Sequence, residues 1–422
     1  MADEFTVLSY DALTGQQLDT IPVGALSFSS QLNQPKSLSG TFNSTDPDIR
    51  KLDIWGSTKP ARTVICVDYR SALVWGGLTV APRTFTLSQK EKVPLQANEL
   101  WSYFTRRVLA TDYSSPPYSG IDPPPGTMPI WNAASVGSPA NLWDPMLMAG
   151  QIVSDAMNYS NTGGINYGTL LGGIPILYNG YSSVSSYLAS GSQTSSANYV
   201  NFTAPFTSLQ TVDSIVTEIV NLGLGVGPDF GIDIAYSSVP GSPPAAALNF
   251  STPTRGRPYS ETNLVIDTAN VYDYTVTEDG NQAAWQVYER GGAGAINVGI
   301  NTNAQEAGYP LLEQVNDHSF ITSGTVQNIL TQISISDLFI CSYPPVSFSI
   351  VMKVNDPGCP FGSYITGDHV WLTVQPDERF PAGLQGEWRI IGWTVNAPDA
   401  GAAKVTLTLN VPPAVTATGP SV

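Results

Sequence analysis

The sequence predicts a mainly β fold in which two strand-rich regions flank an α/β insertion. Two observations support this fold class. Short segments of alternating polar and apolar residues, separated by turn signals, recur through residues 5–98 and again through residues 263–409. The stretch between them contains two segments with the apolar spacing of helices. No fixed-length period repeats along the chain, so a repeat architecture is not indicated.

The first strand-rich region predicts a small barrel or sandwich, because many short strands follow one another at close spacing. Strands are expected at residues 5–10, 18–23, 25–32, 37–43, 63–69, 72–80, 84–88 and 93–98. Residues 99–109 have helical apolar spacing with basic residues near their end, and this helix is expected to close the barrel. The first barrel domain is therefore assigned to residues 1–110.

The middle of the chain predicts a different kind of structure. Residues 111–141 are rich in Pro, Gly and Ser, which indicates a linker or a loop that becomes ordered on assembly. Helices are expected at residues 144–158 and 211–222, with Gly223 ending the second, and a strand at 230–236. This loop and α/β insertion domain is assigned to residues 111–262.

The last part of the chain returns to strand patterns. Strands are expected at residues 271–278, 284–289, 348–354, 369–374, 388–395 and 404–409. A short helical insertion is expected at residues 323–333, and residues 315–319 look like a polar turn. A second barrel domain is thus assigned to residues 263–411, and the Pro/Ala/Thr-rich residues 412–422 are expected to be a disordered tail.

The composition favours a component of an assembly. Charged residues make up 12% of the chain, against about 25% in typical domains, and hydrophobic residues make up 42%. The polar surface must then be mainly Ser, Thr, Asn and Gln, as in some secreted β-proteins, or be covered by other subunits. The net charge of −16 argues against direct nucleic-acid binding, yet it is compatible with a surface that DNA slides past.

The cysteines and the apolar runs give further limits. Cys66, Cys341 and Cys359 are odd in number and lack metal-site spacing. Cys66 and Cys341 are expected to be buried reduced thiols, with a Cys341–Cys359 disulfide as the alternative. The N-terminus has no pattern of a secretion signal, and no apolar run reaches the ~18 residues of a membrane span.

No pattern in the sequence predicts a catalytic, cofactor-binding or metal site, so the chain is expected not to be an enzyme. His318 and His369 have no partner at metal-ligand spacing and are expected to be structural or solvent-facing. A glycosidase needs two carboxylates ~5–9.5 Å apart across a cleft, whereas the paired acids here are sequence neighbours in turns. These pairs are Asp46/Asp48, Glu278-Asp279 and Asp377-Glu378.

Tryptophans near apolar strands are expected mainly in the core, with subunit interfaces as the second choice. They are Trp55, Trp75, Trp371, Trp388 and Trp393.

The order of several segments resembles a known family. The segments are Leu8-Ser-Tyr-Asp-Ala-Leu-Thr-Gly15, Val74-Trp-Gly-Gly77, Glu99-Leu-Trp-Ser-Tyr-Phe104, Gly367-Asp-His-Val-Trp-Leu372 and Trp388-Arg-Ile-Ile-Gly-Trp393. Together they are similar to minor tail proteins of long-tailed, siphovirus-type actinobacterial phages, in particular the tail-tip or baseplate hub family. The resemblance covers most of the chain and is weak between residues 111 and 260.

The resemblance implies two tube-type β-barrels of tail-hub type in each subunit, with inserted and peripheral subdomains. It implies a homotrimeric ring at the virion tail tip, assembled in the host cytoplasm, that closes or adapts the distal end of the tail tube and opens for DNA ejection. The implied partners are a distal tail ring protein, the tape-measure protein and other tail-tip or receptor-binding proteins. Genomic DNA would only pass through the lumen, and no cofactor is implied.

Two other functions remain open from the sequence. One is a carbohydrate-binding or cell-wall-degrading tail protein, which would need exposed aromatic residues and opposed carboxylates around a groove. The other is a distal tail ring protein, which is disfavoured because the chain has two barrel-like regions rather than one.

Overall fold

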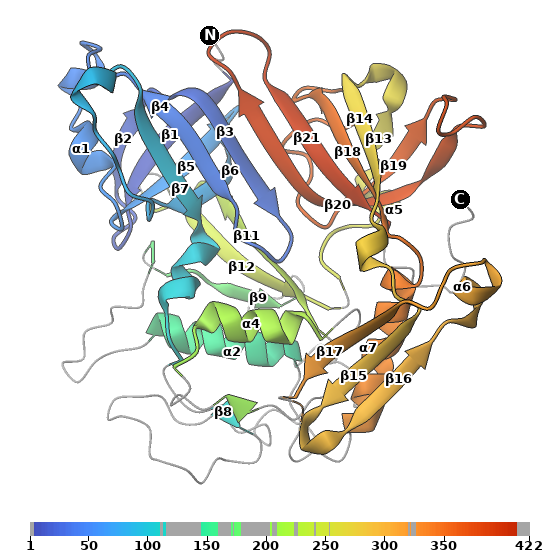
Figure 1. The fold of residues 1–422 in the computed structure, drawn as a ribbon. Helices are drawn as coiled ribbons and strands as arrows, with labels where there is room; N and C mark the ends of the chain where they lie inside the picture. Colours follow the sequence, from blue (N-terminus) through green and yellow to red (C-terminus); the bar gives the residue numbers. More distant parts are fainter. Residues whose placement is uncertain are drawn as a thin grey trace.

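A 13-stranded sheet dominates the fold, and three smaller sheets accompany it in the described part of the chain (Figure 1). The computed structural model describes residues 4–109, 113–114, 145–158, 170–171, 173–178, 203–204, 209–222, 227–239, 242–252, 254–319, 321 and 326–411. The expected mainly β class with an α/β insertion is confirmed.

The first half of the large sheet contains seven strands from the N-terminal region, all paired antiparallel in the order β3-β4-β7-β6-β5-β1-β2. They are β1 (Phe5–Asp11), β2 (Gln17–Ile21), β3 (Gly24–Gln31), β4 (Ser37–Phe42), β5 (Thr63–Tyr69), β6 (Ala72–Leu78) and β7 (Val93–Glu99). The short helix α1 (Ile54–Ser57) lies beside β1 and β2.

The second half of the sheet comes from the C-terminal region, in the order β14-β18-β21-β20, with β19 joining β13 to β20. Its strands are β13 (Val265–Asp267), β14 (Asp273–Glu278), β18 (Val346–Lys353), β19 (His369–Val374), β20 (Leu384–Ala397) and β21 (Lys404–Asn410). The helix α5 (Tyr259–Thr262) packs on β19.

One antiparallel pairing fuses the two halves. β20 pairs with β3 from Gly392 opposite Gln31 to Ala397 opposite Leu26. We call this pairing the β20–β3 seam (Figure 1). Aromatic side chains pack across it, with ring centroids of Phe28 and Trp393 5.7 Å apart and those of Phe28 and Phe361 6.1 Å apart. The two halves therefore share one hydrophobic core, which holds buried residues from both ends of the sequence.

The apolar run in β5 reflects burial on both faces of the sheet. Ile65 and Val67 point into the core shared across the seam, whereas Val64 and Cys66 point into a second core beneath the sheet. Successive side chains of a strand face opposite sides, so a strand buried on both faces needs apolar residues at every position. The second core is completed by the insertion and by the helix α7 (Val326–Cys341).

The described part of the insertion contains two helices and two small sheets, and it covers the underside of the first half (Figure 1). Its elements are β8 (Tyr113–Ser114), α2 (Pro145–Asn158), β9 (Ile176–Tyr178), β10 (Thr203–Ala204), α4 (Val212–Val220), β11 (Asp229–Ala235) and β12 (Ala245–Ser251). Thr211 caps α4, because its hydroxyl accepts a hydrogen bond from the Ser214 amide at 3.2 Å. The strand order in the main sheet of the insertion is β11-β12-β9.

A peripheral subdomain interrupts the second half. It contains β15 (Gln286–Gly291), β16 (Ile296–Ile300), α6 (Thr302–Glu306), β17 (Glu313–His318) and α7, which packs on β15 and β16. Short 3₁₀ helices occur at η1 (Ile49–Lys51), η2 (Leu87–Gln89), η3 (Leu100–Arg106), η7 (Thr268–Asn270), η8 (Gly280–Gln282) and η9 (Gly292–Gly294).

Four local predictions were wrong or incomplete. Residues 84–88 form no strand, because Phe85 and Leu87 are exposed and their alternation does not mark a buried face. Residues 315–319 are no polar turn, since most of them belong to β17 and pair in parallel with β15. The helix expected at 323–333 continues to Cys341. The helix expected at 99–109 is the 3₁₀ helix η3.

Several predictions fall outside the described residues: most of the Pro-rich segment 111–141, the helix end at Gly223 and the tail 412–422. Where the structure is described, each helix is too short or too polar to span a lipid bilayer.

Candidate functional site

One buried carboxylate joins the first half of the large sheet, the insertion and the second half. Asp229, at the start of β11, is 9% exposed. Its Oδ1 accepts a hydrogen bond from Asn33 Nδ2 at 2.8 Å, in the turn after β3. Its Oδ2 accepts from Arg389 Nη2 in β20 at 2.5 Å and from the Arg255 backbone amide at 2.9 Å. Charge-assisted hydrogen bonds of this kind are the strong ones in proteins, so Asp229 ties together three regions that are distant in sequence.

Arg389 extends this junction to the loop before β19. It is 6% exposed and donates from Nε to the Gly367 carbonyl at 3.2 Å and from Nη2 to the Arg255 carbonyl at 2.8 Å. Backbones meet closely here, because a Cβ on Gly256 would lie 2.0 Å from the Gly367 carbonyl carbon. Gly256 and Gly367 both have a φ of +103°, which glycine adopts without strain.

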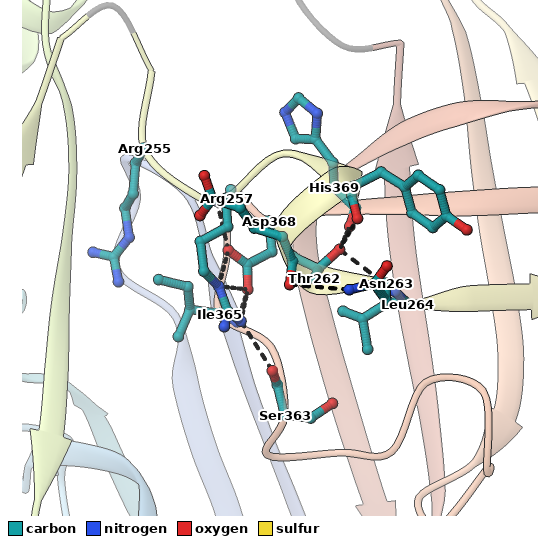
Figure 2. Close-up of polar contacts among 12 residues, drawn as sticks. Arg255, Arg257, Thr262, Asn263, Leu264, Ser363, Ile365, Asp368 and His369 are labelled. Carbon is teal, nitrogen blue, oxygen red and sulfur yellow. Dashed lines mark hydrogen bonds and ion pairs between the residues drawn. The ribbon is translucent and has the colours of Figure 1, made fainter.

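A second ion pair joins the buried Asp368 to the partly exposed Arg257 (Figure 2). Asp368 is fully buried and accepts from Arg257 Nη2 at 2.5 Å, from the Arg257 amide at 2.8 Å and from the Ile365 amide at 3.1 Å. Arg257 also donates to the Ser363 carbonyl at 3.0 Å. The Asp368 carboxylate raises the pKa of Arg257, which stabilises its charged form.

His369 continues this network toward the surface. Its Nδ1 lies 2.6 Å from Glu387 Oε1, and Glu387 Oε1 also accepts from the Tyr259 amide at 3.0 Å. The backbone carbonyl of His369 accepts a hydrogen bond from Thr262 Oγ1 at 2.6 Å, as Figure 2 shows. The structural role expected for His369 is consistent with these contacts. We call this network the polar junction, and its members join the insertion to the two halves of the large sheet. They are Asn33, Asp229, Arg257, Asp368, His369, Glu387 and Arg389.

The second histidine lies in a separate buried cluster in the peripheral subdomain. His318 is 7% exposed, and its Nε2 lies 2.9 Å from Oε2 of the fully buried Glu289. Asn316 Nδ2 donates to Glu289 Oε1 at 3.1 Å and to Asp337 Oδ2 at 2.6 Å. Burial, reinforced by the neighbouring Glu289 carboxylate, raises the pKa of Asp337 to about 7. The sequence did not suggest this cluster, because its members lie on β15, β17 and α7.

Two of the sequence-neighbour acid pairs converge on one surface feature. Glu278 of β14 and Asp377, Glu378 and Arg379 of the β19–β20 loop line an open hollow of about 530 Å³. Glu278 forms an ion pair with Arg379. Asp377 accepts from the Arg379 and Phe380 amides at 2.8 and 2.7 Å, which fixes the turn. Two of the three carboxylates are thus engaged in local contacts. The pair Asp46/Asp48 lies elsewhere, and Asp48 pairs with Lys51.

The cysteines and tryptophans occupy mixed positions. Cys66, Cys341 and Cys359 are buried and free, so no disulfide joins the last two. Trp75, Trp388 and Trp393 are buried as expected, but Trp55 is 40% exposed. Among the described residues, no group of three or more His, Cys, Asp or Glu side chains is arranged to hold a metal ion.

The fold is shared with solved tail proteins. A tail protein from Neisseria meningitidis MC58 aligns with 97% of this chain over 96% of its own length, at 10% identity and a TM-score of 0.53. The 43 kDa tail protein of prophage MuSo2 from Shewanella oneidensis aligns with 97% of this chain over 98% of its own length, at 10% identity and a TM-score of 0.55. No protein-family model and no curated protein matches the sequence.

These alignments show that the chain shares the fold of these two tail proteins, with a large antiparallel sheet and few helices. At 10% identity the likeness concerns the fold alone.

Proposed function

We propose that this chain is a structural protein of a bacteriophage-type virion tail, and more specifically a tail-tip hub subunit. In this role, copies form a ring at the distal end of the tail tube, anchor tip proteins and open for DNA ejection. The observation that carries the proposal is the alignment of nearly the whole chain with nearly the whole of two tail proteins.

The polar junction supports this role. A ring subunit must keep its parts in a fixed arrangement while force and DNA pass through the assembly. The β20–β3 seam and the Asp229–Arg389 pair link regions that are distant in sequence. Buried ion pairs often add little net stability, so we assign this pair the role of fixing geometry.

The surface of the peripheral subdomain also supports a role in an assembly. Ile296, Val298 and Ile300 of β16 are 46–57% exposed, and Val315 of β17 is 70% exposed. Val298 and Val315 both lie opposite Tyr288 in the central strand β15, so the apolar side chains form one strip across the sheet. Contiguous exposed apolar surface of this kind marks contact sites in soluble proteins.

Tails purified from the particle that encodes this chain test the proposal. Mass spectrometry should find the chain in the tail fraction, and gold-labelled antibodies should bind at one end of the tail. Finding the chain only in the lysate outside the particles would contradict the proposal. Incubation of the purified chain with host cell-wall glycan tests the alternative of a carbohydrate-binding or cell-wall-degrading tail protein. That alternative requires binding or cleavage of the glycan, whereas the proposed structural role requires neither.

A further inference from the structure

Seven of the 18 Lys and Arg residues of the chain lie within residues 46–62 and 79–92, where only four Asp and Glu residues occur. Three of those acids have local partners: Asp53 caps α1, Asp46 accepts from the Asp48 amide at 2.8 Å, and Asp48 pairs with Lys51. Lys59, Lys90 and Lys92 are exposed and form no ion pair within the described part of the chain. This region is therefore a positively charged surface on a strongly acidic chain.

Exposed aromatic and apolar side chains lie within this basic surface. Trp55 packs edge-to-face with Phe85 at 5.6 Å between ring centroids, and the Arg83 guanidinium lies 4.8 Å from the Trp55 ring. Phe85 is 48% exposed and Leu87 is 72% exposed. Two hydrogen bonds from Ser44 to the Lys90 carbonyl, at 2.7 and 3.0 Å, hold the loop against the sheet. We call Trp55, Lys59, Arg83, Phe85, Leu87, Lys90 and Lys92 together the Trp55 patch.

The hollow beside β14 has the opposite charge. Residues 267–279 and 375–379 contain six Asp and Glu residues and one basic residue, Arg379, which is paired with Glu278. Tyr274 and Val276 supply an apolar floor, and Glu378 lines the hollow with no hydrogen bond or ion pair to a described residue. We call this feature the β14 hollow. Acidic residues around an apolar floor suit a partner surface that presents aromatic and basic side chains.

The two surfaces cannot meet within one chain, because α1 and β14 lie on opposite sides of the β20–β3 seam (Figure 1). We propose that the Trp55 patch of one copy docks into the β14 hollow of the next copy. Such a contact is head-to-tail, and head-to-tail contacts close into a ring when the rotation between copies allows it. Trp and Arg are the side chains that most often dominate binding energy in interfaces. The inference rests on the proposed function, since it identifies the surfaces through which the ring subunits would associate.

Charge reversal on each surface tests the contact. The variant Lys90→Glu/Lys92→Glu reverses the patch, and Glu378→Lys reverses the hollow. Each alone should weaken self-association of the full-length protein by about tenfold or more in sedimentation velocity, which corresponds to about 1.4 kcal/mol. A chain that carries all three substitutions should associate again, because its patch is now acidic, its hollow is more basic, and the two surfaces attract each other once more. Wild-type association should weaken as salt is raised, since salt screens exposed charges over about 10 Å at 0.1 M.

Two further variants control for net charge and for folding. Arg70→Glu/Arg106→Glu changes the net charge by the same amount as the patch variant, at exposed positions outside the patch, and should leave association unchanged. Leu87→Ser, at a side chain that is 72% exposed, should weaken association while thermal unfolding stays that of the wild type.

The possible failures are distinguishable. Wild-type oligomers that withstand both charge reversals would overturn the assignment of the two surfaces and leave the proposed ring intact. A wild-type chain that stays monomeric at every concentration and salt would overturn the head-to-tail contact, while its presence in purified tails would still support the proposed function. Restoration by the triple substitution supports docking between copies and excludes a different acidic protein as the occupant of the patch.

Discussion

Arg389 in β20 donates a hydrogen bond from Nη2 to Oδ2 of Asp229 in β11 at 2.5 Å, across 160 residues of sequence. The same Asp229 carboxylate contacts Asn33 and the Arg255 amide, so a single side chain connects the insertion to both halves of the large sheet. The relative placement of the three regions therefore depends on a few buried polar groups as well as on the hydrophobic cores.

Asp229→Asn should strongly destabilise the protein. The substitution preserves shape but removes the charge that offsets buried Arg389, and breaking a buried pair in this way costs about 3 kcal/mol or more. Urea unfolding followed by circular dichroism measures the loss. Asp48→Asn is the matched control, because Asp48 pairs with Lys51 at a site where both side chains are mostly exposed, and it should have no measurable effect. Equal effects of the two substitutions would contradict the importance of the junction.

Gly256→Ala should also destabilise the protein. A methyl group there would lie 2.0 Å from the Gly367 carbonyl, and the φ of +103° is strained for alanine. The expected loss in free energy of unfolding exceeds about 1 kcal/mol. Gly280→Ala is the control, since a Cβ at Gly280 meets no atom within 4 Å. If the Gly256 variant unfolds at the wild-type urea concentration, the close backbone contact with Gly367 is not required.

Stability should decrease as pH rises from about 5 to about 8. Burial and the Glu289 carboxylate raise the pKa of Asp337 to about 7, and burial raises the pKa of Glu99 to about 7. A carboxyl with a raised pKa binds its proton more tightly in the folded chain than in the unfolded chain. The stabilisation that such a carboxyl gives the folded chain is therefore complete below the ordinary carboxyl pKa and is lost as pH rises through about 7.

Asp337→Asn isolates one of these groups. The groups that face Asp337 are Glu289 of β15, with Asn316 and His318 of β17, and all three remain in the variant. The midpoint of urea unfolding should then fall less steeply with pH than in the wild type. Parallel slopes for the two proteins would show that Asp337 does not titrate with a raised pKa.

The three cysteines should be unreactive in the folded protein. Cys66 and Cys359 are fully buried, and burial raises the pKa of both thiols. Burial also raises the pKa of Cys341 to about 11, so little reactive thiolate forms near neutral pH. A thiol-reactive dye should label all three only after denaturation, without prior reduction. Labelling of one residue alone after denaturation would indicate a Cys341–Cys359 disulfide.

Much of the strand framework could be predicted from local pattern. The strand expected at residues 369–374 coincides with β19, and the buried run around Cys66 marks β5, because the spacing of apolar residues reports directly on burial. The polar strand β17 could not be predicted, since its pairing with β15 satisfies the backbone while most of its side chains face solvent.

The contacts that place the insertion and the two halves of the large sheet join residues distant in sequence, so no local sequence pattern indicates them. The β20–β3 seam pairs residues more than 360 positions apart, and Asp229, Arg255 and Arg389 appear in sequence as unrelated charges. Trp55 was expected mainly in the core, with a subunit interface as the second choice, because it was taken to lie beside apolar strands. The structure places it beside Arg83 and Phe85 on the surface.

A cryo-electron reconstruction of the tail tip from the particle that encodes this chain tests the central claim most directly. The account predicts several copies of the chain in a closed ring at the distal end of the tail tube, each with the β20–β3 seam intact. A reconstruction in which the distal ring is built from other proteins, with this chain absent from the tail, would contradict it.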